Sequence, residues 1–432
     1  MSDQIPGSGQ PQEDLEVSQV PPAARAPEPS VATTVLRQIV TGNALISLLA
    51  VLLALIVGAI LIVAVDPVVQ QTAGYFFSRP SDMLQAMWNA ASGAYSSLFQ
   101  GAIYNFGAAD FASGIRPLTL TLTFATPLIV AGLGVALSFR VGLFNIGGQA
   151  QILTGAVCAG YVGFAFDLPP VIHLIAAIVA GVVGGALVGA LVGVLKARTG
   201  AHEVIVTIML NYIVLYLLRF LLRTPGALQA PGGNNPKTPP MKSTAIYPLL
   251  LGPNYTLHLG FIVSILATIV VWYLLNRSNL GFQFRAVGEN PNAARVAGIN
   301  VKNIYVWALA ISAGLVGLAG VAQVLGTVTS GFGESIDAGV GFDAITVALL
   351  GRSRPWGVFA AGLLFGALKA GGFAMQANNS VPIDIILVVQ SLIVLFIAAP
   401  PLVRAIFRLP QPPGSRKLRT PRPSSKKVVV TR

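Results

Sequence analysis

Long apolar runs separated by short polar stretches dominate the hydrophobic pattern of this chain. Most runs are free, or nearly free, of charge over the roughly 20 residues that an α-helix needs to cross about 30 Å of hydrocarbon. The pattern therefore predicts an all-α, polytopic integral membrane bundle of about ten segments, some of them incomplete. The predicted segments are 44–65, 117–139, 147–166, 171–195, 204–222, 257–275, 304–328, 344–350, 357–375 and 385–399.

The overall composition supports lipid as the solvent of most of the chain. Mean hydropathy is +0.74 and only 10% of the residues are charged, which is far from any soluble globular protein. The single cysteine, Cys158, excludes an intrachain disulfide, and one cysteine with three scattered histidines argues against a metal site. The chain also lacks a phosphate-binding glycine-rich loop and a Ser/His/Asp set. We therefore expect no cofactor and no enzymatic activity of its own.

The net charge of +12 comes from basic residues in the connections and in the C-terminal region. With the N-terminus inside, Arg140, the loop at 277–302 and the pair Arg352 and Arg354 all fall on the cytoplasmic side. This is the asymmetry of the positive-inside rule, so both termini are predicted to be cytoplasmic. The basic residues do not follow an aromatic-bearing face, and we expect no nucleic-acid binding.

The composition divides the chain into three parts. Residues 1–43 hold scattered Pro, Ser, Gly and acidic residues with few aliphatic ones, which is typical of a disordered cytoplasmic tail. Residues 44–403 form the predicted transmembrane domain, and 404–432 a basic cytoplasmic tail near anionic headgroups. The first apolar run is too long for a signal peptide and lacks a basic segment at the very start, so we expect it to be retained.

A polar, basic island at 279–302 separates two apolar runs. Asn290 is a typical N-cap, Pro291 suits the first helical position and Gly298 is a typical terminator, so the island contains a short helix with its own start and stop signals. Two turns of helix are marginal in water. We therefore expect this helix to dock on a partner. The alternative is a simple loop that joins two spans.

Three motifs of the chain resemble one family of membrane proteins. The first resembles the cytoplasmic coupling loop of ABC-importer permeases and is carried here by Gly288, Glu289, Asn290, Ala293, Ala294 and Gly298. The second is GLFNIGGQAQILTGA at 142–156, which resembles an Asn-Ile-Gly signature, and the third is HEVIVTIMLNYI at 202–213. They occur in the order of the nucleoside and simple-sugar permease family, and the resemblance covers about 44–400.

The resemblance implies the permease subunit of a bacterial ABC importer, a multi-pass protein of the plasma membrane. It also implies three partners besides the lipid bilayer: an ATPase subunit docking on 279–302, a second permease subunit, and an external lipid-anchored or periplasmic substrate-binding protein. The leading tail, the first span and the helical insertion at 81–105 resemble the larger of two permease types that pair in nucleoside systems. The alternative from another class, an ion-coupled secondary transporter, requires intramembrane acids at helical spacing, and none is evident.

Small residues and broken segments mark where helices meet. Gly181, Gly185, Gly189 and Gly193 recur every four residues, which predicts close helix packing.

The apolar piece 344–350 is too short to span and follows a Gly-rich, acidic stretch at 331–343. A similar interruption surrounds 140–148, and the spans before the two interruptions look alike, so we expect two related halves. Lys369 lies about 20 Å into the bilayer from the inner side and is expected to snorkel outward, with the bundle interior as the alternative.

Uncharged amides predict the substrate path: Asn145, Gln149 and Gln151 lie beside a glycine pair, and Asn211 interrupts an apolar helix face. Amides both donate and accept hydrogen bonds, which suits a neutral nucleoside or simple sugar. The alternative is that they bridge helices. The family has Glu and Gly where this chain has Gln149 and Ala150, so a role for an acid there is not expected. A branched-chain amino acid is the other substrate considered, although a zwitterion favours a charged partner.

Overall fold

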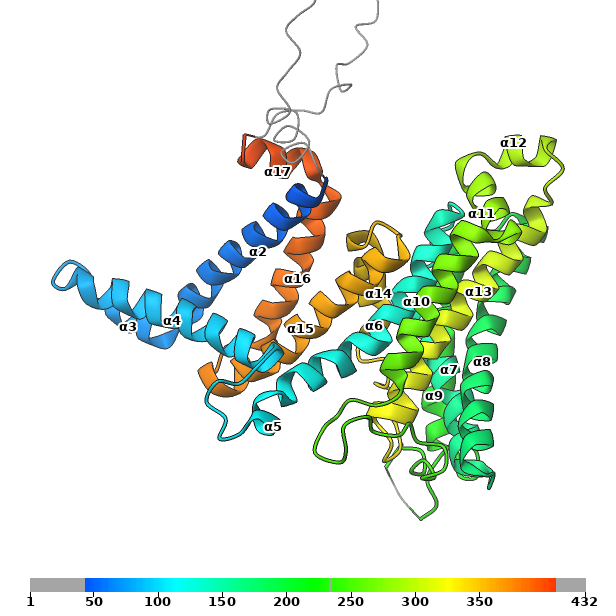
Figure 1. Cartoon of the computed structure of the whole chain (residues 1–432), viewed down its shortest axis with the longest axis horizontal. Helices are drawn as coiled ribbons and strands as arrows, with labels where there is room; N and C mark the ends of the chain where they lie inside the picture. Colours follow the sequence, from blue (N-terminus) through cyan, green and yellow to red (C-terminus); the bar gives the residue numbers. More distant parts are fainter. Residues whose placement is uncertain (1–42, 233–234, 409–432) are drawn as a thin grey trace, which may run out of the picture. The chain divides into compact units, whose positions relative to one another are not determined.

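The computed structural model describes residues 43–232 and 235–408 (Figure 1). In this part of the chain every named element is a helix, and one isolated antiparallel bridge joins Leu249 and His258. The predicted tails lie outside the described residues, apart from residues 43 and 404–408.

The helices of ten or more residues are α2 (Asn43–Val65), α4 (Pro80–Ala102), α6 (Arg116–Arg140), α7 (Gly148–Ala165), α8 (Pro170–Thr199), α9 (Glu203–Arg223), α10 (Gly260–Arg277), α11 (Asn279–Glu289), α13 (Val301–Ala322), α14 (Val340–Leu350), α15 (Pro355–Asn379) and α16 (Ile383–Ala398). The shorter ones are α3 (Pro67–Ala73), α5 (Phe111–Gly114), α12 (Pro291–Val296), the π-helix η1 (Gln323–Thr327) and α17 (Pro400–Ile406).

Each of the ten predicted segments coincides with a helix, and the prediction of an all-α polytopic bundle is confirmed. Seven helices among the described residues are long and apolar enough to cross a membrane. An eighth span results if α16 and α17, which are bent by 94° where Pro400 begins α17, count as one. The remaining two segments, α7 and α14, are the incomplete ones. Helix α7 packs against α13, and α14 packs against α6.

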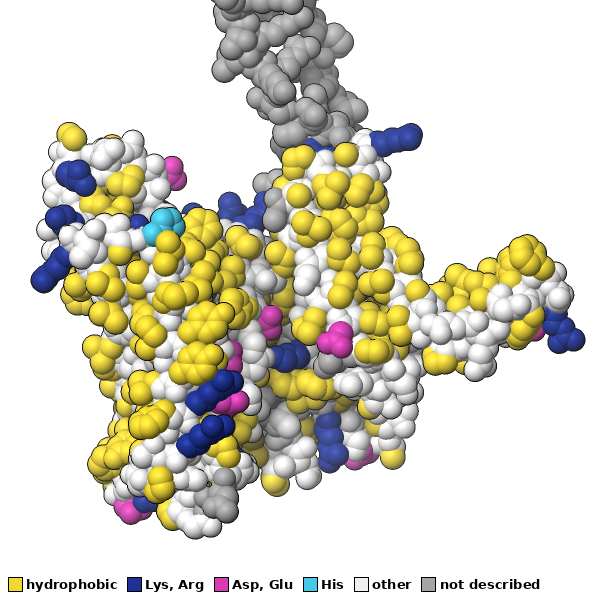
Figure 2. Space-filling model, turned by 180° about the vertical axis from the view of Figure 1, so that it is seen from behind, with side chains coloured by type: hydrophobic (Ala, Val, Ile, Leu, Met, Phe, Trp, Pro, Cys, Tyr) yellow, Lys and Arg dark blue, Asp and Glu magenta, His cyan; other side chains and the backbone are white. Residues whose placement is uncertain are grey.

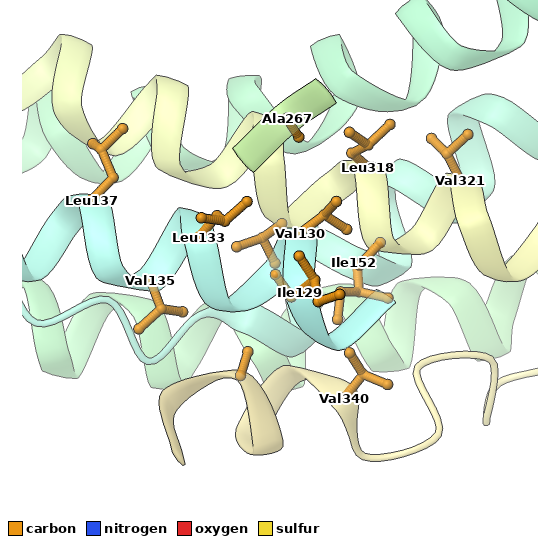
Figure 3. Close-up of a cluster of buried hydrophobic side chains, with 14 of the residues drawn as sticks. Ile129, Val130, Leu133, Val135, Leu137, Ile152, Ala267, Leu318, Val321 and Val340 are labelled. Atoms are coloured by element: carbon orange, nitrogen blue, oxygen red, sulfur yellow. The ribbon is translucent and has the colours of Figure 1, made fainter. Parts of the chain in front are cut away.

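Helix α6 is the centre of the main apolar cluster. The candidate span Phe111–Arg140 consists of α5 and α6, and 83% of its most apolar stretch is buried inside the protein. The corresponding share for α9 is 17%. A helix that is apolar on all sides is stable inside protein or lipid, and the large buried share shows that other helices surround α6. Figure 3 shows side chains of α6 among those of its neighbours: Ile129, Val130, Leu133, Val135 and Leu137 with Ile152, Ala267, Leu318, Val321 and Val340.

Glycines bring the backbone of α8 against that of α13. A Cβ added to Gly185 would lie 2.5 Å from the carbonyl oxygen of Ala313, and one added to Gly193 would lie 2.7 Å from the Cα of Val306. Gly181 and Gly189 face the same helix with as little space. Backbones that touch in this way gain van der Waals contact that larger side chains would prevent. The structure thus places all four predicted packing glycines at one helix interface.

The contacts of α6–α8 recur in α13–α15 with the two halves exchanged. Helix α8 packs on α13 while α15 packs on α6, and α7 contacts α13 while α14 contacts α6. In each half an irregular stretch and then a short helix follow the first helix. Helices α6 and α13 cross at Gly134, where an added Cβ would overlap the carbonyl of Ser312. This arrangement supports the two related halves expected from the sequence, and transporters commonly place such halves around a central pathway.

A second apolar cluster holds α2, α4, α15 and α16 together. The predicted insertion helix at 81–105 is α4, and it packs on α15, where Gly371 leaves no room for a Cβ beside Leu98. The hydroxyl of Tyr95 on α4 donates to the backbone carbonyl of Leu55 on α2. This cluster therefore joins the first span to the second half of the bundle.

Candidate functional site

The polar island between α10 and α13 contains two helices, whereas the sequence predicts one. The hydroxyl of Ser278 accepts the N–H of Gly281 at 2.9 Å and begins α11. Gly281 lies directly against the backbone at the end of α10, where an added Cβ would overlap the carbonyl of Leu274. Phe284 and Val287 are fully buried. Gly281, Phe284 and Val287 form a stripe at three-residue spacing, and their polar neighbours interrupt any longer apolar run that would have revealed this helix.

Local capping defines the second helix, α12. The side-chain oxygen of Asn290 accepts the N–H of Asn292 at 2.9 Å and that of Ala293 at 3.1 Å. Pro291 occupies the first turn. After the last turn Gly298 has a φ of 85°, in the left-handed region that favours glycine. The predicted start and stop signals of this helix are confirmed.

The two faces of α12 differ in exposure. Ala294 is only 4% exposed, whereas Val296 is 91% exposed. In the single chain the side chain of Ala294 packs inward against the bundle, and its contact with the ATPase stays a prediction. The other expected coupling residues, Glu289, Asn290, Ala293 and Gly298, are exposed. Gly288 is half-buried, and an added Cβ would overlap the carbonyl of Arg140 at the end of α6.

Two of the predicted path amides pair with each other inside the protein. The amide nitrogen of Gln151 donates to Asn145 at 2.9 Å, and that of Asn145 donates to Gln151 at 3.1 Å and to the hydroxyl of Ser312 at 3.1 Å. Asn145 also accepts the N–H of Gly147 at 3.1 Å. Asn145 and Gln151 are both 0% exposed. This geometry favours the alternative stated for them, the bridging of segments, over contact with a substrate.

Asn211 makes a similar bridge from α9. Its side-chain oxygen accepts the N–H of Ala150 at 2.9 Å, and its nitrogen donates to the carbonyl of Ile146 at 3.0 Å. The two bonds satisfy backbone groups near the start of α7. Asn211 is 4% exposed, so it fastens the beginning of this incomplete segment to α9.

The two broken segments meet at a glycine contact. A Cβ on Gly148 would lie 2.5 Å from the carbonyl oxygen of Gly341, and one on Gly341 would lie 2.5 Å from the backbone nitrogen of Gln149. The starts of α7 and α14 therefore touch through their backbones. Gln149 is half-buried, and its side chain hydrogen-bonds to the carboxylate of Asp337. Of the four predicted path amides, Gln149 is the one beside charged groups.

Lys369 completes a charged cluster at this contact. Its ammonium group donates to the carbonyl of Ala338 at 3.1 Å and lies within the electrostatic range of Asp337 and Asp343. The expectation that Lys369 snorkels is therefore wrong, because its charge turns toward the stretch before α14. The sequence does contain the acidic residues, in the stretch 331–343. They lie far from Lys369 along the chain, and spacing within one helix cannot identify such a pair. Figure 2 likewise shows a few acidic and basic side chains in the middle of a largely hydrophobic face.

Two exchanged halves, two broken helices that meet through glycines, and a charged cluster beside this contact are typical of a membrane transporter. A family model described as branched-chain amino acid transport system / permease component matches residues 118–398. The chain belongs to this family and is a permease subunit of an ABC transport system. It is a multi-pass membrane protein. Its membership of an ABC permease family sets aside the alternative of an ion-coupled secondary transporter.

Three curated relatives are similar to this chain. The guanosine ABC transporter permease protein NupP of Bacillus subtilis is 36% identical over 326 residues, which are 75% of this chain and 90% of the relative. The glucose ABC transporter permease protein TsgB13 of Haloferax volcanii is 31% identical over 65% of this chain and 75% of its own length. The nucleoside ABC transporter permease protein NupB of Lactococcus lactis is 30% identical over 66% and 79%. No solved structure gives a significant match.

Proposed function

We propose that this chain is the permease of a bacterial ABC importer that moves a nucleoside across the plasma membrane. The observation that carries the substrate class is the similarity to the guanosine permease NupP, which extends over 75% of this chain. A simple sugar is the second candidate, supported by the similarity to the glucose permease TsgB13. A branched-chain amino acid has the support of the family description alone.

Helix α12 is the docking point of a separate ATPase subunit in this proposal. Asn290 caps its start and Gly298 follows its last turn, so its two ends are fixed by neighbouring residues of the same loop. Ala293 and Val296 are the exposed apolar side chains on it. Through Gly288, the end of α11 touches the backbone of α6, the central helix. In this proposal, ATP hydrolysis by the ATPase displaces α12. The contact between Gly288 and α6 transmits this displacement to the central helix of the bundle.

The placement in the membrane follows from the positions of the basic residues. Arg140, Arg285 and Arg354 line one pocket, and the connections that contain them hold much of the basic charge. The positive-inside rule makes this surface cytoplasmic, which puts both termini there as well. A second permease subunit and an external binding protein complete the importer.

The charged cluster is the part of the substrate path that this chain contributes. Gln149, Asp337, Asp343 and Lys369 offer donors and acceptors beside the contact of the two broken helices. Ribose hydroxyls and nucleobase edges need both kinds of group. Asn145, Gln151 and Asn211 hold the surrounding backbone in place.

The test is a substrate panel. The cognate external protein is titrated with nucleosides, pentoses, hexoses and leucine, and uptake of each is measured in vesicles containing the complete importer. We expect tight binding and uptake of nucleosides, with no uptake when the ATPase is omitted. Binding of leucine alone would sink the nucleoside proposal, and binding of a hexose alone would replace it with the sugar.

A further inference from the structure

Three spans end at one pocket. Arg140 is the last residue of α6, Trp272 lies in the last two turns of α10, and Trp356 lies in the first turn of α15. Together with Arg285 of α11 and Arg354 they line a cavity of about 310 Å³. Because α6, α10 and α15 are all long and apolar enough to cross a membrane, their shared ends put this cavity at a membrane surface.

The pocket is positively charged and contains no acidic side chain. Its lining includes three arginines and neither Asp nor Glu. The ion pairs among residues 43–232 and 235–408 involve none of these arginines. Arg140 donates through Nε to the carbonyl of Ser353 at 2.9 Å, whereas Nη1 of Arg285 is buried without a hydrogen-bond partner. A buried guanidinium nitrogen without an acceptor is costly, and three arginines line the pocket without an acidic residue, so the pocket is complementary to an anion.

The start of α15 adds a second, independent anion-binding element. This helix has 25 residues, and no side chain caps its N-terminus. The first-turn N–H groups of Trp356 and Gly357 have no acceptor within the helix. Both residues line the pocket. A helix start of this kind carries partial positive charge and binds phosphate groups, and three guanidinium groups surround it here.

Two tryptophans indicate where the anion comes from. Trp272 is 37% exposed and Trp356 is 50% exposed, and tryptophans at this level of a membrane protein typically lie among lipid headgroups. We propose that this arginine pocket binds the phosphate of an anionic lipid headgroup. Its assignment to the inner leaflet rests on the orientation given under Proposed function. The lipid binding itself does not.

The bound phosphate would connect the ATPase-docking segment with the spans. Arg285 belongs to α11, whereas Arg140 and Arg354 belong to the ends of α6 and α15. One phosphate that accepts from these guanidinium groups would hold α11 against the bundle, and charge-assisted bonds of this kind are among the stronger hydrogen bonds in proteins. Anionic lipid is therefore expected to stabilise the coupling segment.

The pocket's own tryptophans provide the measurement. The chain has four tryptophans, and replacement of Trp88 and Trp307 by Phe leaves the two at the pocket. The full-length protein in nanodiscs is compared with brominated phosphatidylglycerol and brominated phosphatidylcholine as fluorescence quenchers. We expect a preference for phosphatidylglycerol of about tenfold. Arg285→Gln and Arg354→Gln should abolish it, Arg285→Lys should keep part of it, and Arg295→Gln, at an exposed arginine of α12, should leave it unchanged.

Each remaining outcome decides the proposal. Equal quenching by the two lipids overturns it, as does an equal loss in the Arg295→Gln control. Inorganic phosphate that displaces the brominated lipid and stabilises the protein to the same extent assigns the site to free phosphate instead. Loss of the preference on addition of the ATPase subunit identifies the pocket as a protein contact. Because Arg354 is exposed, its variant gives the readout even if Arg285→Gln fails to fold.

Discussion

At the residue scale, Asn145 and Gln149 are chemically alike and differ in what surrounds them. Asn145→Leu leaves the amide of Gln151 and the N–H of Gly147 without partners in a fully buried place, which costs about 3 kcal/mol. We expect a lower thermal midpoint and a lower yield of folded protein in detergent. Gln149→Leu, at a half-buried position, should keep the midpoint and slow uptake. A folded Asn145→Leu protein with the same slow uptake would return Asn145 to the substrate path.

His258 makes stability depend on pH. Its ring stacks on Tyr247 with centroids 5.6 Å apart, and Nδ1 accepts the N–H of Gly260 at 3.1 Å. Burial lowers the pKa of His258 to about 4, below the value of about 6.5 in an unfolded chain. The unfolded chain thus takes up a proton first as pH falls, and stability of about 3 kcal/mol is lost between pH 6.5 and 4.

The measurement for His258 is the thermal midpoint in detergent at pH 7 and at pH 5. His258→Asn keeps an acceptor for Gly260 and removes the titration, so its midpoint should fall less on acidification. His202→Gln, at an exposed histidine, is the matched control and should behave like the unchanged protein. Equal sensitivity of all three proteins would assign the acid effect to other groups.

At the element scale, the contact of α8 with α13 depends on the absence of side chains. Gly185→Val places a branched side chain where a single Cβ would already lie 2.5 Å from a carbonyl oxygen. The helices must separate, and we expect a loss of about 3 kcal/mol, seen as a lower midpoint and aggregation in size-exclusion chromatography. Val183→Leu on an exposed face of the same helix enlarges a side chain without this effect. A stable Gly185→Val protein would show that the interface can move apart freely.

At the scale of the whole molecule, two single-cysteine variants test both the orientation in the membrane and the docking surface for the ATPase. Val296→Cys, at a position that is 91% exposed, and Ala294→Cys, at one that is 4% exposed, are compared in a background without Cys158. A membrane-impermeant maleimide should label Val296→Cys from the cytoplasmic side, and the bound ATPase should protect it. Ala294→Cys should react far more slowly. Labelling of Val296→Cys from the outside would invert the topology.

The sequence by itself determined the membrane-spanning helices and α12. A span is decided by the local free energy of transferring about 20 apolar residues into lipid, and a short helix such as α12 is delimited by caps only a few residues away. Both kinds of information are local. For the same reason the ten segments, the stop at Gly298 and the four packing glycines of α8 follow from the amino-acid sequence alone.

Only the tertiary structure decided which polar side chains are partners. Gln151 turns back to Asn145, whereas Gln149, two positions earlier, meets Asp337 from a segment almost 200 residues later. Lys369 finds its charged neighbours in α14 and in the stretch before it, and Arg285 joins Arg140 in one pocket. Inside a bundle the energy of a polar group depends on the partner that packing brings to it, and no spacing along the chain contains that information.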